Sequence, residues 1–379
     1  MKPIKIVQIN KLFFPWIGGI ETVVRQLVQG LVKSKEFEVT VLAGNEESGL
    51  KSNVYEWQGA KVYKAGSLGI KFSTPLSPMY PFVLRRLIKE NDVFHFHVPN
   101  PLGEVSFFFS KIPAHKKVVV TVHADVQQTR WKFFAPVYNF FFKRLLKRAD
   151  VITTMGPQNI DSFKSLEPFK HKCVVVPLAF DDTHDVEVNE QDKQNFIEKH
   201  KLDINKPIII FVGRLSYYKG IDYLLNAVAK LEKVQLLIAG DGQLKESIVK
   251  QINELQLYSR VRMLGFVQGK ELATAYLVSS LFVLPSTTES ETFGIVQAEA
   301  MKFGLPIINT ALPTAVVSVS LHNVTGLTVG PSDTTALKNA IENIISNKEL
   351  QRTFAQNSLE RSKLFTPEKM VANYSAYYK

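Results

Sequence analysis

The sequence predicts an α/β protein built from two doubly wound, Rossmann-like domains. The chain has 379 residues, of which 45% are hydrophobic and 21% charged, and this length exceeds what one compact core usually organises. Short apolar runs alternate with amphipathic stretches, as parallel strands alternate with crossover helices. The alternation is interrupted by a polar, charged stretch at 181–206 and then begins again. We therefore expect two domains, 1–180 and 181–365.

Six apolar runs in the first half are predicted to be strands, because they are short and rich in valine and isoleucine. Between them, apolar residues recur every three or four positions, which is typical of amphipathic helices. The expected strands are 4–9, 37–43, 93–98, 117–123, 151–155 and 173–178, and the expected helices are 19–33, 80–90 and 131–149.

The second half repeats this pattern and then becomes helical. Its expected strands are 207–213, 234–240, 261–266, 281–286, 306–310 and a weaker 327–330, with helices at 220–232, 243–256, 270–280 and 292–304. Residues 336–365 are predicted to form closing helices. A last helix, about 366–379, could pack back onto the first domain.

Composition narrows the class of protein. The chain has a single cysteine, Cys173, so a disulfide framework is excluded and a reducing compartment is the simpler assumption. No apolar run is long enough to span a bilayer, and the N-terminal residues lack the apolar segment of a signal peptide. We expect a cytoplasmic protein, either soluble or bound to the inner face of the cell membrane.

Positive charge is concentrated in the first half. Residues 1–180 hold 25 Lys and Arg against 13 Asp and Glu, whereas residues 181–379 hold 21 against 22. A basic half next to a neutral one suggests an anionic partner: a nucleic acid, a membrane leaflet or an acidic substrate. Nucleic acid is not expected, since the sequence contains no zinc-ligand spacing and no known nucleic-acid module.

The segment 131–149 combines seven aromatic side chains with a basic face, which suits a helix lying on an anionic membrane surface. The basic face consists of Lys143, Arg144, Lys147 and Arg148. The alternative is a helix whose aromatic side fills the core while its basic residues are only solvated.

The richest motif lies between Glu289 and Pro306, where Glu291 and Glu299 stand eight residues apart around a Phe-Gly pair. Gly294 would let the backbone approach a ligand, and the first N–H groups of the following helix could bind a diphosphate. Carboxylates accept hydrogen bonds from ribose and sugar hydroxyls, so a nucleotide-sugar fits the motif. The alternative is an ordinary amphipathic helix with solvated acids.

Ligands of such sheets bind beyond the carboxyl ends of the strands. In the first half, Gly19 follows the first strand, at the expected start of a helix, and His123 directly follows the fourth. His95 and His97 share one face of their strand by the period-two rule. A lone histidine or glycine turn usually has a structural role, so each is a weak indication by itself.

In the second half, Arg214 follows the first strand and Lys219 comes five residues later. A guanidinium fork and a point charge can together hold a diphosphate. Glycine turns follow the next two strands, at Gly240 and at Gly265. Each could be only a packing turn, but together with the glutamates they predict a positive pocket flanked by acids.

The combination resembles the family-4 retaining glycosyltransferases, whose GT-B architecture places two Rossmann-like domains about a central cleft. The resemblance covers nearly the whole chain. It rests on GGIE at 18–21, HAD at 123–125, VGRL at 212–215 with Lys219, AGDG at 239–242, LGFV at 264–267 and ESETFGIVQAEAM at 289–301.

The resemblance implies a hexosyltransferase and a role for each matching residue. The implied catalytic residues are His123, Glu291, Arg214 and Lys219. The implied donor-binding residues are Gly19, Arg214, Lys219, Gly240, Gly265, Phe266, Val267, Glu291, Phe293, Gly294, Ile295 and Glu299. Arg214 and Lys219 would hold the diphosphate, Glu299 the ribose, Glu291 the sugar, and His123 would lie near the anomeric carbon. The chain departs from the family at Ala315, where glycine is common.

No Asp-x-Asp pair occurs in the chain, so we predict metal-independent transfer in which Arg214 and Lys219 stabilise the leaving diphosphate. No cofactor is expected, since the nucleotide-sugar is a co-substrate. Retention of configuration, with a phosphate oxygen as base, follows from the resemblance alone. Domain closure around residues 180–206 is expected to exclude water.

The resemblance also suggests partners. Segments 99–104 and 319–329 look most like those of bacterial surface-polysaccharide enzymes that extend a lipid-linked oligosaccharide. GDP-mannose is the first choice of donor and a UDP-sugar the second. Three alternatives stay open: a non-hydrolysing sugar-nucleotide epimerase, a phosphorylase carrying pyridoxal phosphate, and a non-catalytic sugar-nucleotide-binding scaffold.

Overall fold

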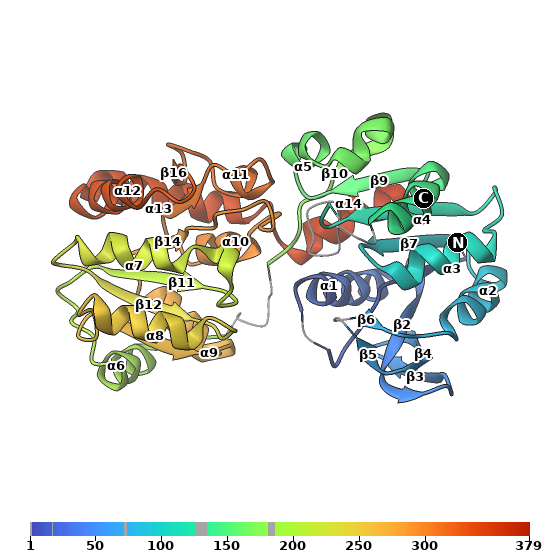
Figure 1. The fold of residues 1–379 in the computed structure, drawn as a ribbon, viewed down its shortest axis with the longest axis horizontal. Coiled ribbons are helices and arrows are strands. Elements are labelled where there is room, and N and C mark those ends of the chain that lie inside the picture. Colours follow the sequence, from blue (N-terminus) through green and yellow to red (C-terminus); the bar gives the residue numbers. More distant parts are fainter. Residues whose placement is uncertain (1, 17, 72–73, 126–134, 181–185) are drawn as a thin grey trace. The chain divides into compact units, whose positions relative to one another are not determined.

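The computed structural model describes residues 2–16, 18–71, 74–125, 135–180 and 186–379 (Figure 1). The chain divides into two compact units, one of residues 1–179 with 367–379 and the other of residues 180–366. Each unit has its own sheet covered by helices, which confirms the predicted class of two doubly wound α/β folds.

The N-terminal unit contains an eight-stranded sheet in the order β10-β9-β8-β7-β1-β2-β4-β3. All neighbours are parallel except β3, which runs antiparallel to β4 at the edge. The strands are β1 (Ile4–Ile9), β2 (Phe37–Gly49), β3 (Asn53–Trp57), β4 (Ala60–Leu68), β7 (Val93–Val98), β8 (Lys117–Val122), β9 (Val151–Thr154) and β10 (Cys173–Val175), and β5 (Ile70–Lys71) with β6 (Thr74–Pro75) forms a small second sheet.

Most helices of the N-terminal unit follow strands of its sheets. The helices are α1 (Gly19–Ser34), α2 (Tyr80–Glu90), α3 (Pro101–Ser110), α4 (Ala135–Arg148), α5 (Pro157–Ser162), the 3-10 segment η2 (Lys164–Lys172) and α14 (Pro367–Tyr378). Proline occupies the first turn of α2, α3, α5 and α14, among others, where its missing N–H costs nothing.

The last helix, α14, belongs to the N-terminal unit although the whole of the other unit precedes it in the chain. It packs beside α1, where Gly30 leaves room for it (Figure 1). A Cβ atom at Gly30 would lie 2.3 Å from Cγ2 of Val371. This contact explains why a helix-disfavouring glycine stands in the middle of α1.

The C-terminal unit contains a six-stranded, wholly parallel sheet in the order β13-β12-β11-β14-β15-β16. Its strands are β11 (Ile208–Val212), β12 (Gln235–Ala239), β13 (Val261–Gly265), β14 (Leu281–Leu284), β15 (Ile307–Thr310) and β16 (Gly326–Val329). Its helical segments are α6 (Glu190–Lys199), η4 (Tyr217–Lys219), α7 (Ile221–Ala229), α8 (Lys245–Glu254), α9 (Gly269–Leu277), α10 (Ile295–Lys302), α11 (Val316–Val319), α12 (Thr334–Ser346) and α13 (Lys348–Ser362).

Several local predictions were incomplete. The stretch 181–206 was expected to be a boundary and hinge, but residues 190–199 form α6, which starts with a capping box between Asn189 and Asp192. Two ion pairs, Lys270–Asp192 at 2.8 Å and Lys199–Glu271 at 2.7 Å, fasten α6 to α9. This part of the stretch therefore belongs to the C-terminal unit.

In the first half, the edge strand β3, its neighbour β4 and the short helices α3 and α5 were not predicted. The expected helix 131–149 is described from Ala135 onwards, and residues 131–134 lie outside the described part of the chain. Among the described residues, none of the helices combines the length and hydropathy that crossing a bilayer requires.

Candidate active site

The candidate site lies at the carboxyl edge of the second sheet, where the strand order changes direction. Strand β12 lies on one side of β11 and β14 on the other. The chain therefore adds β12 and β13 on one side of β11 and then crosses back to place β14 on the other. Such a switch point is where doubly wound sheets bind ligands. Arg214 and Lys219 follow β11, and Glu291 follows β14.

A buried ion pair joins these two loops. Nζ of Lys219 lies 2.5 Å from Oε2 of Glu291, and Ser286 Oγ donates to the same oxygen at 2.9 Å. Both Lys219 and Glu291 are only 7% exposed. Burial by itself lowers the pKa of Lys219, but the facing Glu291 carboxylate outweighs it and the net shift is upward. Lys219 therefore keeps its positive charge in the site.

The loop that carries Glu291 is held by the neighbouring loop. Thr314 Oγ1 donates to the Glu291 carbonyl at 2.7 Å, and the Ala315 N–H donates to the Thr292 carbonyl at 3.1 Å. Ala315 has φ −64°, which any residue adopts, so the departure from glycine at this position imposes no backbone strain.

Gly294 forms the turn into α10. Its φ of 69° lies in the left-handed region, and a Cβ atom there would approach Leu284 Cδ2 to 2.6 Å. The Phe293 side chain is buried and meets Phe365 edge to face at 5.9 Å, so only its backbone can serve a ligand. Ile295 begins α10, whose first N–H groups lack helical partners.

Glu299 lies on α10, just over one turn inside the helix. It is nearly buried, and the Tyr276 hydroxyl donates to its Oε2 at 3.2 Å. Burial first, and the neighbouring Glu299 charge second, raise the pKa of Tyr276 well above its ordinary value. Tyr276 is thus a neutral donor that holds Glu299 in place.

The glycine turns divide into packing and open positions. A Cβ atom at Gly240 would lie 1.9 Å from the Gly213 carbonyl oxygen, and the Gly240 N–H donates to the Gly265 carbonyl at 2.7 Å. Gly240 therefore ties the ends of three strands together. At Gly265, by contrast, a Cβ atom would meet nothing within 4 Å, and the next residue, Phe266, is 67% exposed with Val267 half-buried beside it.

Arg214 differs from Lys219 in being exposed at the strand end. Within the described part of the chain it has no ion pair or hydrogen bond. Its guanidinium is therefore available to an anionic ligand, whereas Lys219 is already positioned by Glu291.

The two remaining predicted residues lie in the N-terminal unit. Gly19 begins α1, and the space around its Cα is open, since a Cβ atom would meet nothing within 4 Å. His123 follows β8 and is buried, with Nε2 3.1 Å from Nδ1 of His97. Burial lowers the pKa of His123 to about 3, so the imidazole is neutral.

Sequence reasoning missed two partners of the glutamates. Ser286 directly follows β14 and its flanking proline, so the strand-end rule could have found it. Tyr276 lies on α9 and reaches Glu299 only through the tertiary fold, and no local signal marks it. Among the residues that the structure describes, no group of three His, Cys, Asp or Glu side chains could hold a metal ion.

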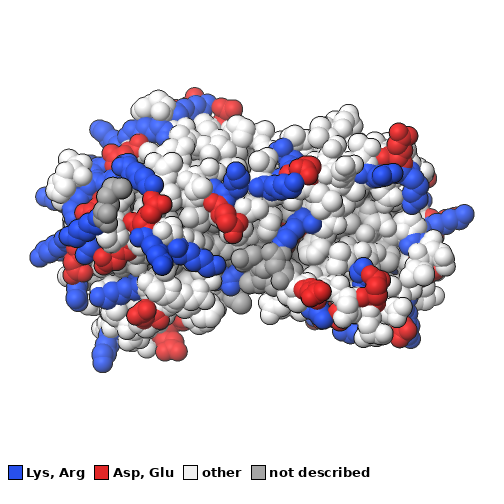
Figure 2. Space-filling view, turned by 180° about the vertical axis from the view of Figure 1, so that it is seen from behind, with Lys and Arg blue, Asp and Glu red and all other residues white. Residues whose placement is uncertain are grey.

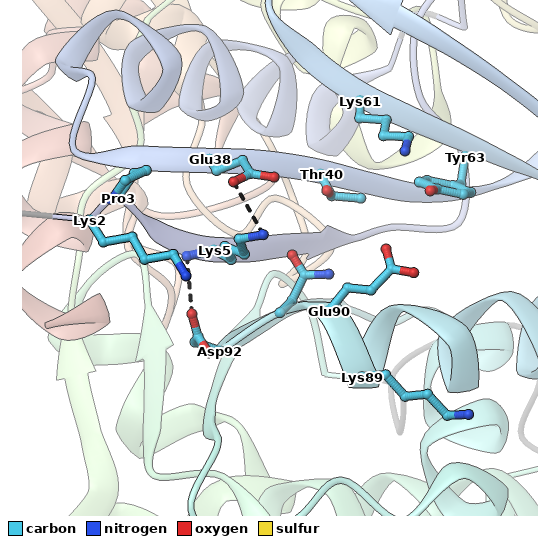
Figure 3. A pocket seen from close by; sticks show the side chains of 11 residues that line it. Lys2, Pro3, Lys5, Glu38, Thr40, Lys61, Tyr63, Lys89, Glu90 and Asp92 are labelled. Atoms are coloured by element: carbon cyan, nitrogen blue, oxygen red, sulfur yellow. Dashed lines mark hydrogen bonds and ion pairs between the residues drawn. The ribbon is translucent and has the colours of Figure 1, made fainter.

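A separate pocket lies at the opposite, amino-terminal end of the first sheet. It is lined by residues including Lys2, Lys61 and Lys89 (Figure 3). Its central cation, Lys5, pairs with Glu38 at 3.5 Å, and the Lys5 N–H donates to Asp92. This pocket lies at the other end of the first sheet from Gly19 and His123, and it includes none of the predicted site residues.

Two Rossmann-like units, one carrying a lysine–glutamate pair and a second glutamate at a switch point, define a transferase of the GT-B architecture. The family described as Glycosyltransferase Family 4 matches residues 17–184, and the family described as Glycosyl transferases group 1 matches residues 192–361. The chain belongs to the family-4, group 1 glycosyltransferases and uses a nucleotide-sugar donor. The resemblance drawn from the motifs is thereby confirmed.

Similar proteins span the whole chain. O-antigen chain mannosyltransferase C of Escherichia coli is 26% identical, covering 99% of this chain and 98% of its own. D-rhamnosyltransferase WbpZ of Pseudomonas aeruginosa is 27% identical, covering 92% and 89%. Among solved structures, Anabaena Alr3699/HepE in complex with UDP superposes with a TM-score of 0.75 at 19% identity, covering 98% of this chain and 99% of its own, which shows a shared fold.

Proposed function

We propose that this enzyme transfers a hexosyl group from a nucleotide-sugar to a glycan acceptor, without a metal ion and with retention of configuration. The observation that carries the proposal is the buried Lys219–Glu291 pair beside the exposed Arg214. This arrangement supplies fixed positive charge where a diphosphate would leave. Preorganised cations in such a site can contribute several kcal/mol of transition-state stabilisation.

The hydrogen bonds of Glu291 suggest how it could serve two ligands. Lys219 and Ser286 both contact Oε2, which leaves Oε1 without a protein partner among the described residues. In the proposal, Oε1 accepts from hydroxyls of the donor sugar while Oε2 anchors Lys219 next to the diphosphate. The Lys219–Glu291 pair is neutral overall, so Arg214 provides the net charge that attracts the donor.

The other predicted residues complete the proposed donor site. Glu299 accepts from the ribose, the N–H groups of Phe293, Gly294 and Ile295 bind phosphate or sugar oxygens, and the open turn after β13 borders the base. The exposed Phe266 gives that turn a flat apolar surface. Gly240 shapes the turn after β12 that borders the proposed donor site.

From the N-terminal unit, Gly19 is proposed to approach the phosphate with its backbone. His123 is proposed to lie near the anomeric carbon, where a neutral imidazole can hydrogen-bond without adding charge. The N-terminal unit would thus be the acceptor-side domain and the C-terminal unit the donor domain.

The proposed donor is GDP-mannose, with a UDP-sugar as second choice, and the proposed acceptor is a lipid-linked oligosaccharide of a bacterial surface polysaccharide. The E. coli relative, named an O-antigen mannosyltransferase, supports the first choice and the acceptor class. The UDP bound in the Anabaena structure supports the second.

The proposal is tested by incubating the purified protein with each donor in EDTA, with and without acceptor glycans. We expect nucleoside diphosphate release only with an acceptor, and loss of it in Glu291→Gln. Glu289→Gln, two residues away, is the matched control and should keep activity. An isomerised donor formed without acceptor would show an epimerase instead.

We also propose that the enzyme binds an anionic membrane through an aromatic-basic surface on α3 and α4, defined by Phe109, Val137, Phe140, Lys143 and Arg144. The three apolar side chains are exposed by 52%, 63% and 47%. The Arg144 guanidinium lies 4.9 Å from the Phe140 ring centroid. Aromatic groups at the surface beside cations suit the boundary between headgroups and acyl chains.

The basic composition of the first half supports this surface, but the structure corrects one detail. Figure 2 shows the face seen from behind, where many Lys and Arg side chains gather on the left with Asp and Glu among them. Arg148, however, is not part of the basic face. It pairs with Asp150 at 3.1 Å and donates to the Pro113 carbonyl, so its role is structural.

Sedimentation with vesicles tests the membrane proposal. We expect binding to vesicles containing anionic lipid at low salt, and loss of it in Lys143→Glu/Arg144→Glu. The matched control, Lys233→Glu/Lys250→Glu, makes the same change in net charge on the other unit and should bind as the wild type does. Equal loss of vesicle binding in both variants would mean that net charge alone drives binding, and it would contradict a specific membrane-binding surface.

A further inference from the structure

A buried polar network connects the C-terminal helix α14 to His123. Strand residues alternate faces, so Gln8 of β1 and His95 and His97 of β7 point to the same face of the sheet, the face that α14 covers. Their neighbours along the strands enter the apolar core on the other face. Each of these three side chains is fully buried, and α14 contributes the buried Tyr378.

The donors and acceptors of the network can be assigned starting from α14. The Gln8 amide nitrogen donates to the Tyr378 hydroxyl at 3.3 Å. With the Gln8 amide in this orientation, the Tyr378 hydroxyl keeps its own hydrogen, which can be donated to His95 Nδ1, 2.7 Å away. His95 in turn donates from Nε2 to Thr121 Oγ1 at 2.7 Å.

The same amide sets the direction toward His123. Because the amide nitrogen of Gln8 faces Tyr378, its oxygen faces His97 Nε2 at 2.9 Å, and that ring nitrogen must donate. A neutral imidazole has one N–H, so His97 Nδ1 is an acceptor. His123 Nε2, 3.1 Å away, therefore donates to it.

All three imidazoles are neutral, as this chain of donors requires. Burial lowers the pKa of His95 and of His97 well below the ordinary value, and neighbouring histidines lower them further. The pKa of His123 is lowered to about 3, also by burial. Only tautomers, and not charges, can therefore differ along the network near neutral pH.

We propose that Tyr378 and Gln8 are positioning residues which, through His97, hold His123 in the tautomer that carries its hydrogen on Nε2. Nδ1 of His123 then keeps its lone pair, and it accepts a hydrogen bond from a hydroxyl of the transferred sugar or of the acceptor. This inference rests on the proposed function, in which His123 faces the reacting sugar. It gives the return of α14 to the N-terminal unit a role in the chemistry as well as in packing.

The reverse arrangement shows why Tyr378 matters. If the Gln8 amide turned over, its nitrogen would donate to His97, His97 Nδ1 would donate to His123, and His123 would present an N–H on Nδ1 to the sugar. The ring nitrogen Nδ1 of His123 would then donate a hydrogen bond to the sugar instead of accepting one. Removing the Tyr378 hydroxyl takes away the acceptor that the Gln8 amide nitrogen has in the present orientation, so this orientation loses its advantage and both arrangements become populated.

The test is ¹⁵N NMR of the full-length protein with labelled histidines, in which protonated and unprotonated ring nitrogens have widely separated shifts. The spectrum of His123→Gln identifies the resonances of His123 among the eight histidines of the chain. We expect one form in the wild type, with the hydrogen on Nε2, and a mixture of two forms in Tyr378→Phe and in Gln8→Leu.

Tyr374→Phe is the matched control. Its hydroxyl is equally buried on α14 but contacts Thr121 at 3.0 Å and has no bond to Gln8. It should lose stability as Tyr378→Phe does while leaving the His123 spectrum unchanged. A merely structural role for Tyr378 would make the two variants alike in every measurement.

Kinetics provide the second measurement. The fall in kcat of Tyr378→Phe should match the fraction of the wrong tautomer, about twofold for an equal mixture, with kcat of Tyr374→Phe unchanged. A wild-type His123 protonated on Nδ1, or an unchanged His123 spectrum in Tyr378→Phe, would overturn the inference. Failure of the proposed function would be seen separately, as absence of sugar transfer by a wild type whose His123 tautomer depends on Tyr378.

Discussion

Separating the buried Lys219–Glu291 pair is predicted to cost far more stability than removing it whole. At 2.5 Å the two charges attract by about 7 kcal/mol at an effective dielectric constant near 20. Desolvation costs several kcal/mol for each ion, so the net value of the intact pair is small. Lys219→Met or Glu291→Gln leaves one buried charge without its partner. Each single variant should therefore lower the free energy of unfolding by about 3–5 kcal/mol.

The double variant Lys219→Met/Glu291→Gln removes both charges and should lose less than about 2 kcal/mol. The raised pKa of Lys219 means that the pair's stabilisation is present below the ordinary lysine value and is lost only as the pH rises through the folded value. Measurements near pH 7 therefore report the fully charged pair. All three variants should lose transferase activity.

Urea denaturation followed by far-UV circular dichroism measures these changes. All three tryptophans, at positions 16, 57 and 131, belong to the first half, so their fluorescence follows the N-terminal unit and serves as an internal control. Single variants that each lose under about 1 kcal/mol, with a double variant equal to their sum, would refute the description of a buried, coupled pair.

Three further predictions concern other contacts. Gly240→Ala should destabilise the C-terminal unit by more than about 3 kcal/mol in the same denaturation assay. The new Cβ would lie 1.9 Å from a backbone oxygen, and residue 240 has a φ of 141°, which side chains rarely adopt. A loss of stability under about 1 kcal/mol would contradict this prediction. Burial raises the pKa of Glu104 to about 7, so the stability of the wild type is unaffected by this group below about pH 4.5 and falls as the pH rises through 7. Glu104→Gln cannot ionise, so its free energy of unfolding should gain up to about 3 kcal/mol relative to the wild type between pH 5 and 8. A difference in stability between the two proteins that does not change with pH would count against this prediction. Gly30→Ala should loosen α14 through its 2.3 Å contact with Val371 and cost about 1–3 kcal/mol, with Gly30→Ala/Val371→Ala less than additive; strict additivity would exclude the clash.

The fold class could be predicted because the central strands of both sheets are parallel. Runs such as 208–212 and 281–284 are buried on both faces, so they are continuously apolar and easily recognised. The edge strand β3 could not be found in this way, since it is largely exposed and its residues alternate without an apolar run. Its neighbour β4 is mostly buried, but Lys61 and Lys64 interrupt its apolar residues. The helix α6 was hidden for a related reason, because only Phe196 of its residues is buried.

Parts of the site followed from the position of residues at strand ends, and parts did not. Arg214, Lys219 and Glu291 come shortly after strands that proved to be neighbours, so their spacing predicted a cluster. The pairing of Lys219 with Glu291 could not be predicted, because it depends on how η4 turns back toward β14. The histidine network was equally hidden, since Tyr378 lies 283 residues after His95.

Binding of nucleoside diphosphates and nucleotide-sugars in the presence of EDTA tests the central claim most directly. Thermal-shift or calorimetric measurements with GDP-, UDP-, ADP- and dTDP-sugars should show that one nucleotide class stabilises the wild type without metal, and that Arg214→Ala and Glu299→Gln abolish this while Glu289→Gln keeps it. Binding that requires a divalent metal, or that survives in the Arg214 and Glu299 variants, would contradict a metal-independent donor site at the carboxyl edge of the second sheet.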